Sequence, residues 1–302
     1  MSKIVFVTGF PRSGTTLLAS ILSRHNKLCT MGETHYFLAT NLLPILPKTK
    51  RWWNNYIANN RRFQIIDYRL TDDEESDKKM TRDEYFSIYS TSYAKTKHAE
   101  WFVEKSPVHV DVIPSIRKAY PDAPIINIVR DVRDTTHSLL ESPWAHNDPL
   151  KHMVEWRCFQ RQTKRFEKKY QIGMLQVKYE DLISKPEETI VAILKHISPE
   201  LEFSEALLAD SKALDAIPDY EKAWKSKAAE KPDVSRLSAW KKAPQPWHKY
   251  AAICNKELES YGYEPRVERD ISLKEKCIAW VYSTSAYRNL RVFVKLRSIY
   301  DR

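Results

Sequence analysis

Two groups of residues in this sequence have the types and spacing needed to bind a phosphate-like anion. The first is the loop from Gly9 to Thr16, in which Arg12 and Ser13 lie between two glycines. The apolar run Ile4 to Val7 precedes this loop, and leucines and isoleucines at helical spacing follow it. The pattern predicts a buried strand, a tight turn and a helix, a combination that aims backbone N–H groups and a helix dipole at an anion.

The second group follows another apolar run, Pro124 to Val129. Arg130 comes directly after this run, and Ser138 lies eight residues further along the next predicted helix. Arginine offers a planar fork of donors to a phosphate, and a serine two helical turns away can reach the same oxygens. The alternative is a charged helix start without a ligand. Since both groups follow buried strands, a nucleotide is expected across one edge of a parallel sheet.

The first loop differs from the P-loop of nucleotide triphosphatases at one position. Its frame is Gly9-x-x-x-x-Gly14-Thr15-Thr16, so a threonine, Thr15, stands where the P-loop has its lysine. The basic residue is Arg12, inside the loop. A nucleotide 5′-phosphate still fits, but the usual means of holding a γ-phosphate is missing. The alternative is a plain turn between strand and helix that happens to carry glycine and threonine.

These residues resemble those of the sulfotransferases that use 3′-phosphoadenosine 5′-phosphosulfate (PAPS). The run Pro11 to Thr16 is similar to their 5′-phosphosulfate loop, and arginine in the loop looks most like the tyrosylprotein sulfotransferases and the bacterial and carbohydrate branch. Arg130 with Ser138 is similar to the signature that binds the cofactor 3′-phosphate. The resemblance covers most of the chain up to Pro265. It implies an α/β fold with a P-loop-like open parallel sheet of about four to five strands, flanked by helices.

The resemblance also implies roles for individual residues. Lys105 matches the lysine that points at the bridge between phosphate and sulfate, and Glu33 matches the carboxylate that serves as general base. Tyr179 matches a position near the cofactor, although a packed tyrosine is an equal alternative. Lys231 resembles part of a basic loop that closes over the cofactor, in a region, 218–243, whose register the sequence leaves open. The expected cofactor-binding residues are Arg12, Ser13, Gly14, Thr15, Thr16, Arg130, Ser138, Tyr179 and Lys231, and the expected catalytic residues are Glu33, Lys105 and Arg12.

Two histidines compete with Glu33 for the role of base. Histidine is the usual general base near neutral pH, and the cytosolic branch uses one that lies two residues after its lysine. In this chain Pro107 occupies that position, and His109 comes two residues later. His35 lies close to Glu33 in the sequence. Because proline, not histidine, occupies the position that the cytosolic branch uses, the resemblance favours Glu33 as the general base.

Composition limits the classes of partner. The chain has 302 residues and a formal charge of +10, from 49 basic and 39 acidic residues, which suits a polyanionic cofactor, an acidic acceptor or an anionic membrane. It shows no zinc-finger spacing and no RNA-recognition signature, so nucleic acid is not expected as a partner. The four cysteines are far apart, which indicates free thiols, and neither a metal ion nor a metal-ligand cluster is expected.

Two regions are expected: a catalytic domain over 1–265 and a basic amphipathic extension over 266–302. The segment 272–302 reads as a helical tail that could contact an anionic membrane or pack on the catalytic domain. No signal peptide and no apolar run of about 18 residues is visible, so a cytoplasmic enzyme is expected, with the tail at the inner membrane face. The aromatic, basic stretch Arg51 to Arg62 could line an acceptor cleft or form an ordinary amphipathic helix.

The leading function is transfer of a sulfuryl group from PAPS to a hydroxyl or amine, with adenosine 3′,5′-bisphosphate as product. A carbohydrate or glycolipid is the expected acceptor, while peptidyl tyrosine and small hydroxylated metabolites stay open. The enzyme alternative is a P-loop nucleotide kinase, against which the missing lysine and the Arg130–Ser138 pair argue. The remaining alternative is a basic module that binds nucleic acid or membrane, which would show salt-sensitive binding.

Overall fold

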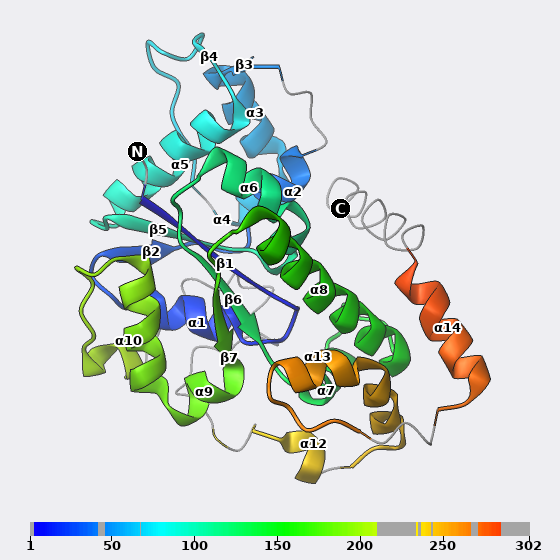
Figure 1. Ribbon diagram of the computed structural model, residues 1–302. Coiled ribbons are helices and arrows are strands. Elements are labelled where there is room, and N and C mark those ends of the chain that lie inside the picture. The colour runs from blue at the N-terminus through cyan, green and yellow to red at the C-terminus, as the bar shows by residue number, and fades with distance from the viewer. Residues whose placement is uncertain are drawn as a thin grey trace.

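A parallel sheet forms the centre of the molecule. The computed structural model describes residues 3–41, 46–66, 68–209, 234, 237–242, 244–266 and 271–284. Within these ranges five strands pair side by side in the order β2-β5-β1-β6-β7, and every pair is parallel (Figure 1). The strands are β1 (Lys3–Gly9), β2 (Leu28–Thr30), β5 (Trp101–Lys105), β6 (Ile125–Val129) and β7 (Leu175–Lys178), and a separate antiparallel pair joins β3 (Lys48–Thr49) to β4 (Lys79–Met80). The predicted open parallel sheet is confirmed.

Helices cover both faces of this sheet. Along β1, Val5 and Val7 pack in one apolar cluster with α1 and α10, whereas Ile4 and Phe6 pack in another with α2, α5 and α6. The period of two is that of a strand buried on both faces, which explains the nearly continuous apolar sequence. The helices are α1 (Thr15–Leu22), α2 (Tyr36–Thr40), α3 (Lys50–Asn59), α4 (Arg61–Ile66), α5 (Arg82–Thr96), α6 (Ile113–Ala119), α7 (Val132–Leu140), α8 (Pro149–Tyr170), α9 (Tyr179–Ser184), α10 (Pro186–Ile197), α12 (Ala239–Lys242), α13 (Asn255–Ser260) and α14 (Leu273–Ser283).

The register of the central strands brings three loops together. Val7 of β1 lies opposite Lys105 of β5, and Gly9 of β1 lies opposite Ile128 of β6. The carboxyl ends of β1, β5 and β6 therefore reach the same edge of the sheet. The loop before α1, the residues after Lys105 and the residues after Val129 start side by side there.

Capping residues fix the start of the two longest helices. The Thr81 hydroxyl accepts a hydrogen bond from the backbone N–H of Glu84, and the Glu84 carboxylate accepts one from the backbone N–H of Thr81, which together form a capping box at the start of α5. The Asp148 side chain accepts from the N–H of Lys151 at the start of α8. The sequence predicts a helix over about 82–96 and a helical stretch over 149–170, and both helices occupy these ranges.

The sequence predicts one helix from Pro107 to about 119 and another over 246–261, and both begin differently from this expectation. The segment after Lys105 starts as a 3-10 helix, Pro107–Val112, and becomes α-helical only in α6. Pro114 lacks the N–H that a continuous α-helix from Pro107 needs at this point, which explains the break. Similarly, the segment predicted as one helix from Pro246 is a 3-10 helix over Pro246–Cys254, followed by α13. A further 3-10 turn spans Glu205–Leu208.

The C-terminal extension is described over α14, which lies beside α8 (Figure 1). Ala279 of α14 packs with Leu150 and Val154 of α8, and the Tyr282 hydroxyl donates to Asp148 at 3.0 Å. The inner side of α14 thus packs on the catalytic region, as one of the two predictions for the tail required. No helix in the described part of the chain has the length and apolar character needed to cross a bilayer.

Candidate active site

The loop between β1 and α1 adopts the conformation of an anion cradle. Arg12 and Gly14 have positive φ angles of 70° and 99°, and the N–H of Ser13 donates back to the carbonyl of Phe10 at 3.0 Å. Left-handed residues in such a turn direct successive backbone N–H groups to one side. The Ser13 side chain is fully buried, and its hydroxyl has no hydrogen-bond partner among the described residues. A buried hydroxyl without a partner, at the start of a helix, is a feature that a bound phosphate or sulfate oxygen would satisfy.

Gly14 is required by packing as well as by its backbone angle. A Cβ atom at this position would lie 2.5 Å from Cδ2 of Tyr179. The Tyr179 ring is buried and closes the side of the loop. Any side chain at Gly14 would therefore displace either the loop or the ring. Thr15, buried, and Thr16, half-buried, start α1 directly after this contact.

The two predicted anion-binding groups meet. Nε of Arg12 donates to Oγ of Ser138 at 2.9 Å, and a guanidinium nitrogen of Arg130 lies 3.4 Å from the carbonyl oxygen of Arg12. The Arg130 guanidinium also lies over the Tyr179 ring, 4.3 Å from its centroid. Two guanidinium groups held this close concentrate positive charge, which favours binding of an anionic ligand. Tyr179 is thus both a packed tyrosine and a neighbour of the predicted 3′-phosphate site.

The predicted base lies against the predicted catalytic lysine. Nζ of Lys105 donates to Oε1 of Glu33 at 2.9 Å, and both side chains are largely buried. The other carboxylate oxygen of Glu33 lies 3.3 Å from Nε2 of His35. Glu33 therefore sits between a lysine and an imidazole at the carboxyl end of β5. A carboxylate there can accept a proton, and an ammonium there can neutralise charge on a leaving group.

His109 lies in a different environment. Its ring is buried and packs edge-on against Phe37, with ring centroids 5.5 Å apart. Burial lowers the pKa of His109 well below its usual value, and the positive charge of His35 lowers it further. The nearest carboxylate to His109 is that of Glu104, at 3.7 Å. The geometry favours Glu33 over His109 as the group that meets an acceptor.

A second carboxyl group, which sequence analysis missed, holds the Glu33 turn. Oε1 of Glu104 accepts hydrogen bonds from the hydroxyls of Thr34, at 3.0 Å, and Ser106, at 2.6 Å. The Ser106 hydroxyl in turn accepts from the backbone N–H of His35, whose φ is 52°. Glu104 is fully buried, and burial raises its pKa to about 7. The signal in the sequence was an acidic residue inside an otherwise apolar strand, where a charge needs a purpose.

Charged residues after β6 fix the start of α7. Asp131 accepts from the backbone N–H of Arg133 at 2.8 Å and from its guanidinium Nε at 2.9 Å. The Arg133 guanidinium lies 3.6 Å from the centroid of the Trp240 ring, and the backbone N–H of Trp240 donates to Asp134 at 2.9 Å. The short helix α12 therefore docks on α7 next to Arg130. Lys231, the predicted residue of the basic loop, lies outside the described residues.

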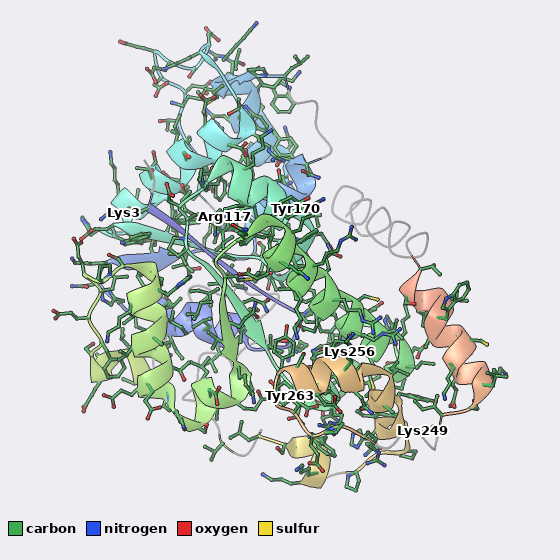
Figure 2. All side chains as sticks on the ribbon, viewed as in Figure 1. Lys3, Arg117, Tyr170, Lys249, Lys256 and Tyr263 are labelled. Carbon is green, nitrogen blue, oxygen red and sulfur yellow. The ribbon has the colours of Figure 1, made fainter. Side chains whose placement is uncertain are left out.

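The C-terminal part of the catalytic region is tied to the same sheet edge. The hydroxyl of Tyr263, labelled in Figure 2, donates to Glu180 at 2.6 Å, and Glu180 also accepts from the N–H of Asp131. Burial raises the pKa of Glu180. Through Glu180, Tyr263 thus supports Asp131, the residue next to Arg130.

The stretch Arg51 to Arg62 lies largely in the amphipathic helix α3, which was one of its two predicted roles. Trp53 is buried and stacks on Tyr85, with ring centroids 5.7 Å apart. Trp52 is partly exposed, stacks on Tyr56 at 5.6 Å, and lies 5.6 Å from Nζ of Lys48. One side of α3 is therefore core, and the other is an aromatic, basic surface.

Comparison with known proteins gives the family. Residues 5–205 match the model of the sulfotransferase family. A Caenorhabditis briggsae protein with a provisional protein-tyrosine sulfotransferase name is 29% identical over 215 residues, covering 68% of this chain and 68% of that protein. Protein-tyrosine sulfotransferase 1 of Danio rerio is 24% identical over 276 residues, covering 87% of this chain and 72% of the relative.

Solved structures share the fold. The sulfotransferase domain from the curacin biosynthetic pathway superposes with a TM-score of 0.61 at 16% identity, covering 88% of this chain and 99% of that chain. The sulfotransferase domain from the Synechococcus PCC 7002 olefin synthase gives a TM-score of 0.60 at 20% identity, covering 86% and 94%. The family match disfavours the kinase and the binding-module alternatives. Because the family model spans well over half of the chain, the chain belongs to the sulfotransferase family and is an enzyme of the PAPS-dependent type.

Proposed function

We propose that the chain transfers the sulfuryl group of PAPS to a hydroxyl group of its acceptor, with Glu33 as general base. The residues present fit the cofactor, because the buried Ser13 hydroxyl has no protein partner among the described residues and lies beside Arg12. The 5′-phosphosulfate end would be held by the loop residues Arg12 to Thr16, and the 3′-phosphate by Arg130 and Ser138. When bound, PAPS supplies the sulfuryl group and leaves as adenosine 3′,5′-bisphosphate.

The catalytic work of the chain is positioning and charge neutralisation. Sulfuryl transfer resembles phosphoryl transfer, in which the protein mainly aligns the groups in line and stabilises the charge that develops. Lys105 and Arg12 carry the positive charges for this purpose. Glu33 accepts the proton of the acceptor hydroxyl, and its contact with His35 orients the carboxylate. The observation that carries the proposal is the 2.9 Å contact between Lys105 and Glu33 at the carboxyl end of β5.

The acceptor is proposed as a carbohydrate or glycolipid, with the exposed ring of Trp52 as a surface on which a sugar could stack. A second candidate is peptidyl tyrosine in an acidic context. The names of the relatives and the net charge of +10 support this second candidate.

The deciding experiment measures sulfuryl transfer from PAPS to a panel of saccharides, glycolipids, acidic tyrosine peptides and simple phenols, with a mass-spectrometric readout. Sulfated saccharide or glycolipid supports the first candidate, and sulfated peptide the second. If no acceptor is sulfated and calorimetry detects no binding of adenosine 3′,5′-bisphosphate, the proposed function is wrong.

We also propose that the tail contacts a membrane and that the protein is located in the cytoplasm. Leu273, Trp280 and Val281 on α14 are exposed and lie near Lys274 and Lys276. An exposed apolar stripe flanked by lysines suits an anionic bilayer surface. Flotation with anionic vesicles, for the full chain and for a chain without residues 272–302, tests the contact. Equal vesicle binding by the two proteins would contradict it, and cell fractionation tests the location.

A further inference from the structure

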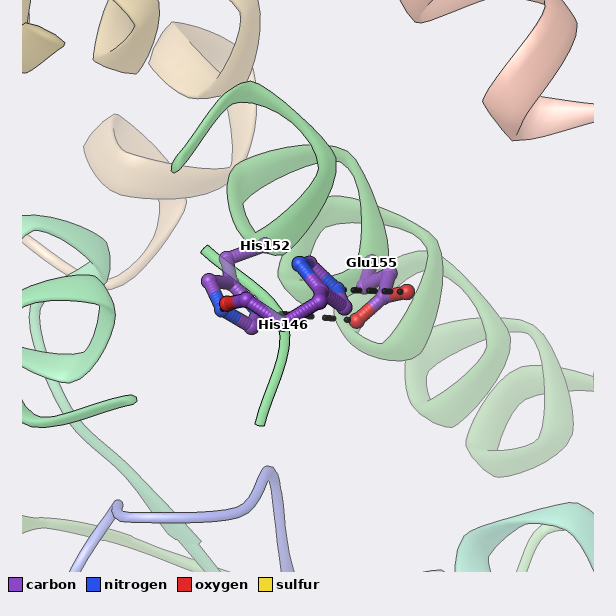
Figure 3. Close-up of side chains that lie close together, drawn as sticks. All are labelled: His146, His152 and Glu155. Atoms are coloured by element: carbon purple, nitrogen blue, oxygen red, sulfur yellow. Dashed lines mark hydrogen bonds and ion pairs between the residues drawn. The ribbon is translucent and has the colours of Figure 1, made fainter. Parts of the chain in front are cut away.

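We infer that His146, His152 and Glu155, none of which is assigned to catalysis, form a binding site for a transition-metal ion such as Zn²⁺ (Figure 3). His146 lies in the loop between α7 and α8, while His152 and Glu155 lie three residues apart in the first turns of α8. One ligand atom from each residue lies within 4.8 Å of the other two. Two imidazoles and one carboxylate form a donor set typical of zinc, whereas Mg²⁺ and Ca²⁺ prefer oxygen ligands alone. The inference does not depend on the proposed function.

The hydrogen bond made by Nε2 of His152 leaves Nδ1 as the nitrogen that can bind a metal ion. Its Nε2 lies 2.8 Å from the backbone carbonyl oxygen of His146. A carbonyl oxygen can only accept, so Nε2 carries the hydrogen, and in a neutral ring Nδ1 carries the lone pair. Metal-binding histidines usually donate their other N–H to a backbone carbonyl or carboxylate in this way.

The lone pair of His152 faces an acceptor. Nδ1 of His152 is buried, has no hydrogen-bond partner among the described residues, and lies 3.8 Å from a carboxylate oxygen of Glu155. On the other side of the carboxylate, Nε2 of His146 is also buried without a hydrogen-bond partner in the described ranges, at 3.5 Å. An imidazole lone pair and a carboxylate repel each other in a buried site, and a cation between them removes this cost. The competing occupant is a proton, which would convert His152 to an imidazolium ion.

Binding requires one ring to turn. The His146 and His152 rings are stacked, with centroids 3.8 Å apart and planes at 13°. A metal ion lies in the plane of each imidazole that binds it, at about 2.0–2.1 Å from the nitrogen, so two stacked rings cannot share one ion. His146 is the ring that can move, because it lies in a loop and its side chain is one-third exposed. Its rotation separates the two rings and breaks a long hydrogen bond, 3.3 Å, from the backbone N–H of Asp148 to Nδ1 of His146.

The position of the site indicates a structural role. It connects the loop after α7 to the start of α8, and Asp148 beside it accepts the hydrogen bond from Tyr282 of α14. A bound ion would cross-link the loop to α8 at the point where α14 packs. We therefore expect the ion to raise thermal stability and to leave the turnover number unchanged.

The test uses the full chain after treatment with a chelator. Titration with Co²⁺ should give the visible absorption bands of a low-symmetry site with a stoichiometry of one, and Zn²⁺ should displace the Co²⁺. At a hundredfold excess of Zn²⁺ over its dissociation constant, Tm should rise by about 5 °C. The variants His152→Gln and Glu155→Gln should lose both signals. The matched control is His137→Gln, because His137 and Glu141 form an exposed pair at 3.4 Å without a third ligand.

Each outcome decides the inference. Absence of the Co²⁺ spectrum, or a spectrum retained in both His152→Gln and Glu155→Gln, overturns it. Circular dichroism checks that the variants are folded. If a variant does not fold, nitrogen NMR of the histidine rings in the unmodified chain replaces it. If the Nδ1 signal of His152 shifts when Zn²⁺ is added, the metal site is supported. If His152 is doubly protonated at pH 7.5 and its signals do not change with Zn²⁺, a proton occupies the site and the inference is overturned.

Discussion

Replacing Glu104 by glutamine should change how the stability of the protein depends on pH. Burial raises the pKa of Glu104 from 4.5 to about 7, so the folded protein holds a proton that the unfolded chain releases between these values. A folded state that binds more protons loses stability as pH rises, here from pH 4.5 to about pH 7. Above pH 7 the loss is complete. At about 1.36 kcal/mol per pH unit it amounts to about 3 kcal/mol of unfolding free energy.

A glutamine side chain at position 104 should remove this pH-dependent loss of stability and keep the hydrogen bonds. Its oxygen can accept from Thr34 and Ser106, as Oε1 of Glu104 does. Its NH₂ group takes the place of Oε2, which has no hydrogen-bond partner among the described residues. A protonated carboxyl group also places a donor at one oxygen, so Glu104→Gln should match the unmodified protein at pH 4.5. At pH 8 the variant should be more stable by about 2–3 kcal/mol, because it carries no buried charge.

The assay is urea unfolding of both proteins at several pH values between 4.5 and 8. Other groups with raised pKa values, such as Asp134 and Glu180, titrate in both proteins and cancel in the difference. The reasoning fails if the two proteins show the same slope of stability against pH, or if the variant is the less stable one at pH 8. As a control, Glu104→Ala removes the acceptor for both hydroxyls and should be less stable at every pH.

Three further predictions concern the candidate active site. In calorimetry, adenosine 3′,5′-bisphosphate should bind about 10- to 100-fold more tightly than AMP, because one charge-assisted phosphate contact contributes about 1.5–3 kcal/mol. The Arg130→Ala variant should lose this preference. Equal affinities of the unmodified protein for the two nucleotides would refute the assignment of Arg130 and Ser138 to the 3′-phosphate. Gly14→Ala should lower Tm and weaken nucleotide binding, because its Cβ would lie 2.5 Å from the ring of Tyr179 and its φ is 99°; an unchanged melting curve would show that the loop adapts. Glu33→Gln should keep nucleotide binding and lose about 10²–10⁴ in kcat, whereas a near-normal rate for it beside an inactive His109→Ala variant would give the role of base to the histidine.

The sheet and the meeting of the anion loops could be predicted from the sequence because they follow from short-range patterns. Apolar runs such as Ile4 to Val7 specify buried parallel strands, and the carboxyl ends of such strands must share an edge. The capping box of Thr81 and Glu84, which the sequence also predicts, marks the start of α5. These features depend on residues close together in the chain.

The parts that could not be predicted depend on side-chain packing between distant segments. The hydrogen bond from Thr34 to Glu104 joins residues 70 positions apart, and the one from Tyr263 to Glu180 spans 83. Sequence analysis likewise identified no metal-ligand cluster, since the ligand atoms of His146 and His152 come together only through the fold of the loop before α8. Residue types and their spacing in the sequence do not show which partner a buried polar side chain contacts in the fold.

The two adjacent residues at the end of β5 divide the work of the site. Side chains alternate along a strand, so Lys105 and Glu104 point to opposite sides. Lys105 meets the Glu33 carboxylate directly, while Glu104 holds Thr34, the next residue in the chain, through its hydroxyl. Glu33 is therefore fixed by a charge on one side and by a backbone anchor on the other. Because a second carboxylate charge nearby would repel that of Glu33, the anchor serves best while Glu104 keeps its proton. The pKa of about 7 that burial gives Glu104 keeps this group mostly protonated below about pH 6 and half protonated at about pH 7.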